Sequence, residues 1–342
     1  MNDPLINISV IMPIYNTAQF LKTALDSILD NDISNIEIIL INDGSTDNSE
    51  NICLKYVSKY ENIRYYSQTN SGQGTARNFG VSMAKGTYIY FMDSDDYLES
   101  NALDKLYSMA VSEDLEGIFF DAELFYDSQF NQNEKLPFSN KKIYQRDSSL
   151  GVFNSGQNLL SEFTSQNNYT PSPCLYFIKR EIIVNNGLKF PAGIIHEDEY
   201  FMISLLLHLK KCKHINERLF YRRVREGSTM TIKNNSKSME GYATVILLLD
   251  KRINDSIFSN NYNRQMYLKL LYSFYSAFLK FYNNIDDNEK LQKKELIDET
   301  LRVVKNKYRY FNWRGFISTV NYPLFLFLSQ IKKNIKVCSN EN

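Results

Sequence analysis

The stretch Tyr88–Asp96, with the sequence YIYFMDSDD, decides the fold class of this chain. Its first five residues are aromatic or aliphatic, and such short apolar runs predict a strand that is buried on both faces. Three carboxylates follow within four residues, from Asp93 to Asp96. We therefore expect these carboxylates to lie just beyond the end of a buried strand.

Strand and helix patterns alternate in the sequence before this stretch. Short apolar or β-branched runs predict strands over residues 8–12, 36–41, 63–66 and 87–92. Helical spacing of apolar residues predicts helices over residues 17–29 and 72–84 and over the segment that follows Asp47. This alternation predicts βαβ units with a parallel sheet, and hence an α/β fold.

Polar residues follow three of the predicted strands. Tyr15 and Asn16 follow the first strand, Asp43 follows the second, and Asp93–Asp96 follow the fourth. Ligands of such sheets bind beyond the carboxyl ends of the strands. The three sets are therefore expected to share one crevice.

The sequence after residue 98 is less regular. It predicts a strand over residues 117–125, a polar loop over 127–140, a loop that enters a strand over 170–178, and a helix that begins near Glu197. Helical periodicity dominates from residue 238 onward, and residues 290–310 are predicted to form a charged helix.

Composition excludes several classes of protein. The 342 residues are 43% hydrophobic and 23% charged, as in globular proteins, and 39 basic residues balance 39 acidic ones. A zero net charge gives no overall field for nucleic acid, so no nucleic-acid partner is expected. The four cysteines form no CxxC pattern, which argues against structural zinc and favours a reducing compartment. We see no signal peptide and no apolar run long enough to span a membrane.

The carboxylates of Asp93, Asp95 and Asp96 need a counter-charge because they repel one another. Hard oxygen ligands of this kind suit Mn²⁺ or Mg²⁺, which would bridge to phosphate oxygens. The alternative is a helix over residues 97–109, whose N-terminus would be favoured by acidic residues.

Two further segments carry candidate binding groups. Asp43 can accept an N–H or hydroxyl group from a base or ribose, or it can form an Asx turn before Gly44. In residues 70–78, NSGQGTARN, two glycines allow close backbone approach to a diphosphate, and Arg77 adds a fixed charge. A GxG pair alone is a weak signal, since most such pairs are plain loops.

Taken together, these segments resemble glycosyltransferase family 2, whose members have the GT-A fold and use nucleotide sugars. The resemblance runs from about residue 8 to 98 in four ordered motifs: VIMPIYN at 10–16, NDGSTD at 42–47, Gly72 with ARN at 76–78, and DSDD at 93–96. In this family the second motif contacts uracil and the fourth is the metal-binding DxD motif. No GxGxxG follows the first strand, so a dinucleotide oxidoreductase is not supported.

The resemblance extends, more thinly, into the following half of the chain. HEDE at 196–199 is similar to the family's ED motif, whose aspartate is the catalytic base and is here Asp198. The alternative is an acidic first turn of a helix. RRVREGST at 222–229 resembles a basic segment that could fold over the diphosphate, or it could be a solvated loop. The QxxRW sequence of processive members is absent.

The resemblance implies an inverting, metal-dependent hexosyltransferase that moves one sugar from a UDP-sugar. Asp198 would take the proton of the acceptor hydroxyl, and Asp95 supported by Asp93 would hold the metal. Tyr15 would stack on the base, and Asp43 would accept the uracil N–H. The nucleotide-sugar site is expected to comprise Pro13, Tyr15, Asn16, Asp43, Arg77, Asp93, Ser94, Arg223 and Arg225.

Near the C-terminus, aromatic residues are interleaved with Lys and Arg between positions 305 and 336. This pattern suits either an interfacial segment on an anionic membrane or a helical cap on the catalytic domain or on a second subunit.

We therefore expect a GT-A domain over 1–235, with a nucleotide-binding half (1–98) and an acceptor half (99–235), and a helical region over 236–342 that associates with membrane or oligomerises. The expected acceptor is a lipopolysaccharide, capsule or other surface glycan, at a cytoplasmic location or on the inner face of the cell membrane. A catalytically inactive GT-A partner of a glycan-assembly complex is the alternative.

Overall fold

The computed structural model describes residues 6–31, 35–127, 144–146, 148–225, 235–252 and 257–308. The chain divides into two compact units, Met1–Thr300 and Leu301–Asn342. The sheet and the helices up to α10 belong to the first unit, and helix α11 contains the division between the two. The predicted loop over 127–140 and most of the aromatic and basic C-terminal segment lie outside the described residues.

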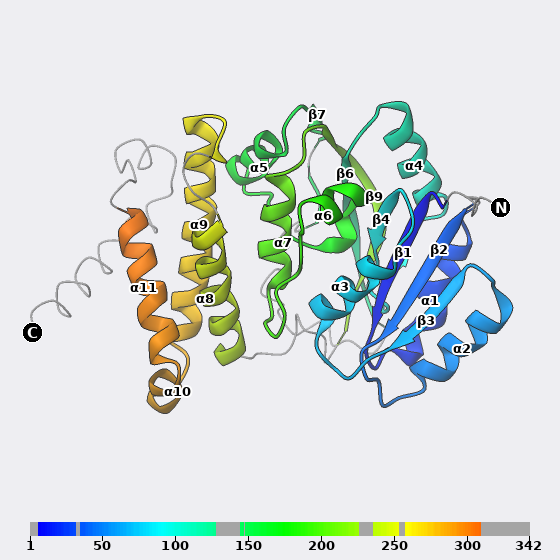
Figure 1. The fold of residues 1–342 in the computed structure, drawn as a ribbon, viewed down its shortest axis with the longest axis horizontal. Coiled ribbons are helices and arrows are strands. Elements are labelled where there is room, and N and C mark those ends of the chain that lie inside the picture. Colours follow the sequence, from blue (N-terminus) through cyan, green and yellow to red (C-terminus); the bar gives the residue numbers. More distant parts are fainter. Residues whose placement is uncertain are drawn as a thin grey trace, which may run out of the picture. The chain divides into compact units, whose positions relative to one another are not determined.

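The described strands form one sheet in the order β3-β2-β1-β4-β8-β6-β9-β5, with β7 beside β9 (Figure 1). The strands are β1 (Ile8–Ile14), β2 (Ile36–Asn42), β3 (Ile63–Ser67), β4 (Tyr88–Phe91), β5 (Tyr97–Leu98), β6 (Gly117–Tyr126), β7 (Gly151–Phe153), β8 (Tyr176–Lys179) and β9 (Cys212–Val224). The first four strands are parallel, as predicted. The rest of the sheet is mixed, because β8 runs antiparallel to β4 and β6 while β9 runs parallel to β6.

Helices connect and cover the strands. They are α1 (Ala18–Leu29), α2 (Ser49–Lys59), α3 (Gln73–Met83), α4 (Ala102–Ser112), α5 (Gly156–Ser165), α6 (Arg180–Asn185), α7 (Glu197–Leu206), α8 (Asn235–Arg252), α9 (Asn261–Tyr282), α10 (Asp287–Gln292) and α11 (Lys294–Tyr308), with a 3₁₀ turn at Pro173–Leu175. Beyond the sheet, α8 packs against α7 and α9, and α9 also packs against α5. No described helix has the length and apolarity that a bilayer span requires.

One sequence prediction about local structure is wrong. Residues 97–98 form strand β5, and the next helix begins only at Ala102, so no helix starts directly after Asp96. Tyr97 is held in the sheet because β5 pairs with β9 and its ring stacks on Tyr221 at 4.6 Å between centroids. The alternative that Asp95 and Asp96 serve as a helix N-terminus is therefore excluded.

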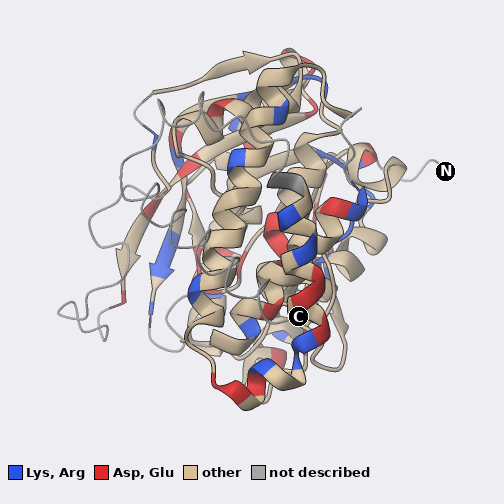
Figure 2. Cartoon of the chain, turned by 90° about the vertical axis from the view of Figure 1, so that its left-hand side faces the viewer, with Lys and Arg blue, Asp and Glu red and all other residues tan. Residues whose placement is uncertain are grey.

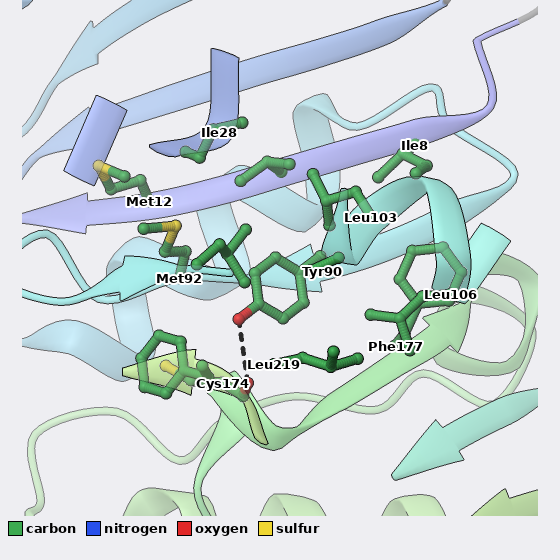
Figure 3. Packing of buried hydrophobic residues seen from close by; sticks show 14 of the residues in the cluster. Ile8, Met12, Ile28, Tyr90, Met92, Leu103, Leu106, Cys174, Phe177 and Leu219 are labelled. Carbon is green, nitrogen blue, oxygen red and sulfur yellow. Dashed lines mark hydrogen bonds between the residues drawn. The ribbon is translucent and has the colours of Figure 1, made fainter. Parts of the chain in front are cut away.

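One large cluster of the hydrophobic core lies between the sheet and helices α1 and α4. Residues of the opposite strand face, such as Ile11, Ile39 and Phe91, are also fully buried. Figure 3 shows Ile8 and Met12 of β1, Tyr90 of β4 and Phe177 of β8 within this packing. The hydroxyl of Tyr90 is fully buried and donates to the Cys174 carbonyl at 3.0 Å, so this polar group has a partner. The core thereby fixes β1 and β4, whose ends carry the predicted site.

Charged residues of both signs are interspersed along the described helices that face the viewer in Figure 2. This distribution agrees with the zero net charge of the sequence.

Candidate active site

The loops that follow β1 and β2 are tied to each other by hydrogen bonds. Asn16 has a left-handed backbone, with φ of 51°, and its side-chain oxygen accepts the Thr46 N–H at 2.8 Å. Ser45 Oγ accepts the Asn16 N–H at 3.1 Å, and Asp47 accepts the Ala18 N–H at 2.9 Å. These bonds fix both loops at one edge of the sheet.

Asp43 joins the end of β2 to the segment that opens α3. Its buried carboxylate accepts hydrogen bonds from Gln68 Nε2 at 2.7 Å, from the Ser71 N–H at 2.8 Å and from the Gly72 N–H at 2.9 Å. These partners are 25 to 29 residues away in sequence, so the carboxylate is not used in an Asx turn before Gly44. A carboxylate can accept about four hydrogen bonds, which leaves one position for a ligand.

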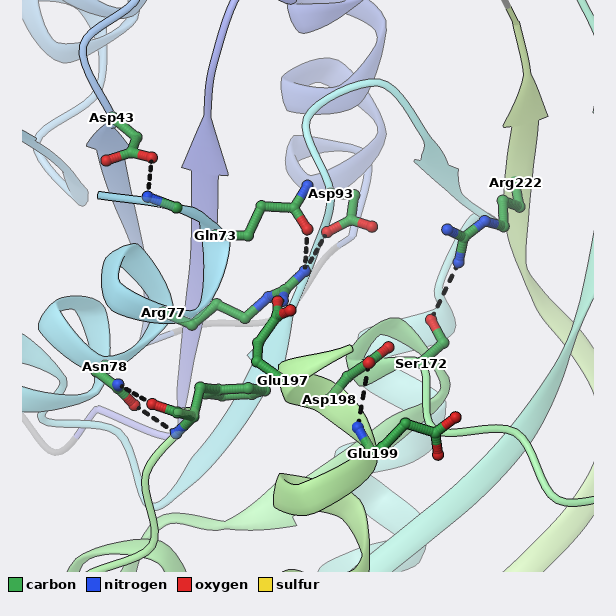
Figure 4. A network of polar contacts seen from close by, with 12 residues as sticks. Asp43, Gln73, Arg77, Asn78, Asp93, Ser172, Glu197, Asp198, Glu199 and Arg222 are labelled. Atoms are coloured by element: carbon green, nitrogen blue, oxygen red, sulfur yellow. Dashed lines mark hydrogen bonds and ion pairs between the residues drawn. The ribbon is translucent and has the colours of Figure 1, made fainter. Parts of the chain in front are cut away.

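Arg77 of α3 is the centre of a buried ion-pair network (Figure 4). Its side chain is 2% exposed and donates to Asp93 Oδ1 at 2.8 Å and to Glu197 Oε1 at 3.1 Å. Its guanidinium also lies over the Phe190 ring, 5.4 Å from the centroid. This network connects the end of β4 to the first turn of α7.

A glycine permits the close approach of α3 and α7. A Cβ atom on Gly74 would lie 2.7 Å from Glu197 Cγ and 3.0 Å from Phe190 Cβ, closer than real side chains come. The second glycine of the GQG motif therefore serves the contact between two helices. The sequence alone allows the glycine pair to approach a diphosphate, which for Gly74 is not the contact found.

Arg77 and its partners shift one another's protonation. Burial alone would raise the pKa of Asp93, but the charges of Arg77 and Arg222 outweigh it and lower that pKa. Burial, and then the charge of Asp198, raise the pKa of Glu197 to about 7, against the opposing effect of Arg77. Asp93 is therefore held ionised, whereas Glu197 exchanges its proton near neutral pH.

The end of β9 lies against the carboxylate cluster. Arg225 Nε donates to Asp95 Oδ2 and Arg223 Nε donates to the Asp95 carbonyl, both at 2.8 Å. The Arg223 N–H donates to Asp96 Oδ1 at 2.7 Å. Burial and the neighbouring Asp95 raise the pKa of Asp96 well above its ordinary value. Asp96 thus has a structural bond to β9, while Asp95 and Arg225 face each other as an ion pair.

A pocket of about 520 Å³ opens at this edge of the sheet. It is lined by Pro13, Ile14, Tyr15, Asn16, Thr17, Asp43, Asn70, Gly72, Gln73, Asp93, Ser94, Asp95, Arg225 and Lys237. The ends of β1, β2 and β4 thus share one crevice, and the half-exposed Tyr15 presents its ring at the pocket. Arg77, Arg223 and Asp198 are not part of the lining. Arg77 contacts it through Asp93, and Arg223 contacts it through Asp95.

Asp198 lies on the first turn of α7, which begins at Glu197 as the sequence predicted. Its Oδ1 atom accepts the Glu199 N–H at 3.1 Å, and in Figure 4 it lies beside Glu197. Among the described residues, no ion pair joins Asp198 to a lysine or arginine, whereas Glu197 is bound by Arg77. Asp198 is half-buried, whereas Glu197 is buried and held by Arg77.

The sequence places Arg222 in a candidate basic segment without a role of its own, and it does not mark Lys237 at all. Arg222, on β9, donates to Ser172 Oγ at 3.2 Å, lies over the Tyr144 ring and lowers the pKa of Asp93 by its charge. Its position in the basic RRVR segment was a usable signal. Lys237 of α8 lines the pocket, and no local motif marks it.

The chemistry of the pocket suits a hard divalent cation. Asp95 and Asp93 present carboxylate oxygens at its wall. In enzymes that bind substrate phosphates, Mg²⁺ or Mn²⁺ is held by one or two carboxylates together with those phosphates. The described residues contain no cluster of three or more His, Cys, Asp and Glu side chains arranged around a common point.

Comparisons with a family model and with curated proteins point to the same family. The model of the family "Glycosyl transferase family 2" matches residues 9–168. The glycosyltransferase GlyG of Streptococcus pneumoniae is 31% identical over 261 residues, which cover 73% of this chain and 80% of GlyG. The minor teichoic acid biosynthesis protein GgaB of Bacillus subtilis is 29% identical over 273 residues, or 77% of this chain. The chain spans only 28% of GgaB and 60% of another curated glycosyltransferase.

Solved structures share the fold at low sequence identity. Residues 1–349 of S. aureus TarS, in complex with UDP-GlcNAc, align with a TM-score of 0.64 and 20% identity over 87% of this chain and 82% of that one. The mannosyltransferase PcManGT from Pyrobaculum calidifontis, in complex with GDP-Man and Mn²⁺, aligns with a TM-score of 0.53 and 14% identity over 92% of this chain and 84% of that one. The chain has the GT-A fold with a helical C-terminal region, and it belongs to the enzymes of glycosyltransferase family 2.

Proposed function

We propose that this protein transfers one sugar, with inversion, from a UDP-sugar to a hydroxyl group of a surface glycan, and that Asp198 is the general base. The observation that carries the proposal is the shared pocket, where the ends of β1, β2 and β4 present Tyr15, Asp43 and Asp95. The Asp93–Arg77–Glu197 chain connects this pocket to the turn that bears Asp198.

The uridine end of the donor fits the β1 and β2 side of the pocket. Tyr15 is 48% exposed, so its ring is open to stack on a base. Asp43 is fixed by three protein donors and has acceptor capacity for the N–H group of uracil. Pro13, Asn16 and Ser94 complete the walls around these two residues. The complex of TarS with UDP-GlcNAc supports a uridine nucleotide for this pocket.

The diphosphate end fits the β4 side. Asp95, supported by Asp93, would hold Mn²⁺ or Mg²⁺, which would neutralise the charge that develops on the departing UDP. Arg225 lies beside Asp95 at 2.8 Å and can place its own charge on the same phosphates. Arg77 and Arg223 are positioning residues, because Arg77 fixes Asp93 and Arg223 binds the Asp95 carbonyl.

The acceptor side begins at α7. Asp198 would take the proton of the acceptor hydroxyl as that oxygen forms its bond to the anomeric carbon, and the bond between this carbon and the UDP oxygen would break on the opposite face. Glu197 is less suited to this role because Arg77 binds its carboxylate and α3 covers it. The roles of the two residues are therefore separable by substitution.

The acceptor class rests on relatives. GgaB is named for minor teichoic acid biosynthesis, which supports a surface glycan as acceptor. We further propose that the protein is cytoplasmic and that the aromatic and basic segment after residue 308 either binds the inner face of the cell membrane or joins a second copy of the chain. Deletion after Asn312 should shift the protein from the membrane fraction to the supernatant while UDP-sugar hydrolysis is retained. Unchanged partition would favour an oligomer.

The test of the proposed function is UDP release from a panel of nucleotide sugars, with crude glycolipid as acceptor and with Mn²⁺ or chelator. We expect turnover with one or more UDP-sugars and little with chelator. Binding of UDP without turnover of any donor would instead support a catalytically inactive partner protein. No binding of UDP would overturn the assignment of the pocket.

A further inference from the structure

Lys237 brings the C-terminal helices into the donor pocket. It lies near the start of α8, beyond the residue at which the sequence ended the catalytic domain, yet it lines the same pocket as Asp43 and Asp95. The pocket lining contains three acidic residues, Asp43, Asp93 and Asp95, and two basic ones, Arg225 and Lys237. Lys237 is therefore one of two cations on this wall.

Packing against the segment that leads into α7 fixes the position of α8. A Cβ atom on Gly241 would lie 2.2 Å from the Ile195 carbonyl oxygen, so only glycine allows this approach. One residue further, Tyr242 stacks on His196 with 4.2 Å between ring centroids. Met239 and Ser238 are buried beside Lys237. These contacts hold the start of α8 against the segment that leads to Asp198, and the exposed Lys237 lies one turn before Gly241.

The charge of Lys237 selects one part of a nucleotide sugar. The base, the ribose and a neutral hexose carry no charge, whereas the diphosphate carries the negative charge of the donor. A lysine ammonium has three donors on a compact charge and suits a phosphate oxygen, for which it needs no fixed bidentate geometry.

We propose that Lys237 is a diphosphate-binding residue, and that α8 thereby completes the donor site. This inference rests on the proposed function, because it requires a nucleotide diphosphate in the pocket. It also implies that the helices after residue 235 are part of the catalytic unit, in agreement with a compact unit that extends to Thr300.

The test compares two ligands that differ only in the diphosphate. Calorimetry with Mn²⁺, repeated with chelator, would give the dissociation constants of UDP and of uridine for the full chain and for Lys237→Gln, Lys237→Arg and Lys251→Gln. Lys251 is a matched control, because it is an exposed lysine in the last turn of the same helix.

We expect Lys237→Gln to weaken UDP about tenfold, as for the loss of a hydrogen bond to a charged group, and to change uridine binding less than about twofold. Lys237→Arg should retain most of the UDP affinity, and Lys251→Gln all of it. Equal UDP affinity of Lys237→Gln and the unaltered chain would overturn the inference. An equal loss for uridine and UDP, or the same loss in Lys251→Gln, would also overturn it. If the unaltered chain binds no UDP, the proposed function fails and the inference fails with it.

Discussion

Two buried arginines anchor two polar networks in this protein, and only one of the networks lies at the donor pocket. Arg77 is 2% exposed, binds Asp93 and Glu197 and lies over the ring of Phe190. Arg146 is 7% exposed, binds Asp121 at 2.6 Å and lies over the ring of Phe163. By burial, charge and aromatic contact the two arginines are nearly equivalent.

The third member of each network differs in kind. Glu197 beside Arg77 has its pKa raised to about 7 by burial and by the charge of Asp198. His214 beside Asp121 is fully buried, and burial lowers its pKa. Its Nδ1 atom accepts the Leu150 N–H at 3.2 Å, so Nε2 carries the proton and faces Asp121 at 3.2 Å.

The comparison shows that a buried ion pair does not by itself mark a site. Asp93 of the first network lines the donor pocket, whereas no member of the second network does. Asp121 and His214 instead hold the backbone of Arg146 and of Leu150 beside strands β6 and β9. We assign the first network to positioning of the active site and the second to stability of the fold.

The largest expected effect is the loss of either arginine. Arg77→Met and Arg146→Met each leave a buried carboxylate unpaired, which typically lowers the free energy of unfolding by about 3–5 kcal/mol. Urea denaturation measures this loss, and calorimetry of the folded fraction measures UDP affinity. Only Arg77→Met should also lower the affinity for UDP, because Asp93 faces the pocket and Asp121 does not.

If the methionine variants do not fold, Arg77→Lys and Arg146→Lys retain the charge and allow the same comparison. A variant of Arg146 that weakens UDP as much as the matching variant of Arg77 would contradict the division between the two networks.

Asp95→Ala sharpens the comparison from the pocket side. Asp95 pairs with Arg225, but its charge also repels the buried Asp96, so the relief of this repulsion should offset part of the stability lost with the pair. We expect turnover stimulated by Mn²⁺ to fall on the order of a hundredfold or more, because the ion would lose its main protein ligand. Turnover with added Mn²⁺ and with chelator is the measurement. Turnover that stays high and insensitive to chelator in the variant would show that Asp95 does not hold the metal.

The smallest expected effects are opposite dependences of stability on pH. The raised pKa of Glu197 means that its contribution to stability is full below about pH 4.5 and is lost as the pH rises toward 7. The lowered pKa of His214 means that its contribution is present above pH 6.5 and is lost as the pH falls.

Urea denaturation at pH 5 and pH 7.5 separates the two. Glu197→Gln should cost less stability at pH 7.5 than at pH 5, and His214→Gln should cost more. If both variants lose more stability at the same one of the two pH values, the two networks do not differ in their dependence on pH.

The sequence was informative where local pattern and site coincide. Short apolar runs separated by helical patterns predicted the four parallel strands. The residues after β1, β2 and β4 line one pocket, as expected. The helix predicted over 97–109 begins only at Ala102, because the pairing of β5 with β9, more than 120 residues away, overrides local propensity at residues 97–98. Nothing local to α3 shows that Gly74 serves a contact with Glu197, nor does anything local to α8 place Lys237 in the pocket.

The most direct test of the central claim is kcat for sugar transfer beside calorimetric UDP affinity in Asp198→Asn, with Glu197→Gln as the neighbouring control. Asparagine keeps an acceptor oxygen but cannot take a proton at working pH. We predict that kcat in Asp198→Asn falls by about 10²–10⁴, as for the loss of a general base, while UDP affinity stays within about twofold. A Glu197→Gln variant without activity beside an active Asp198→Asn would move the base by one residue. Full activity in both variants would contradict the claim that this turn of α7 performs the chemistry.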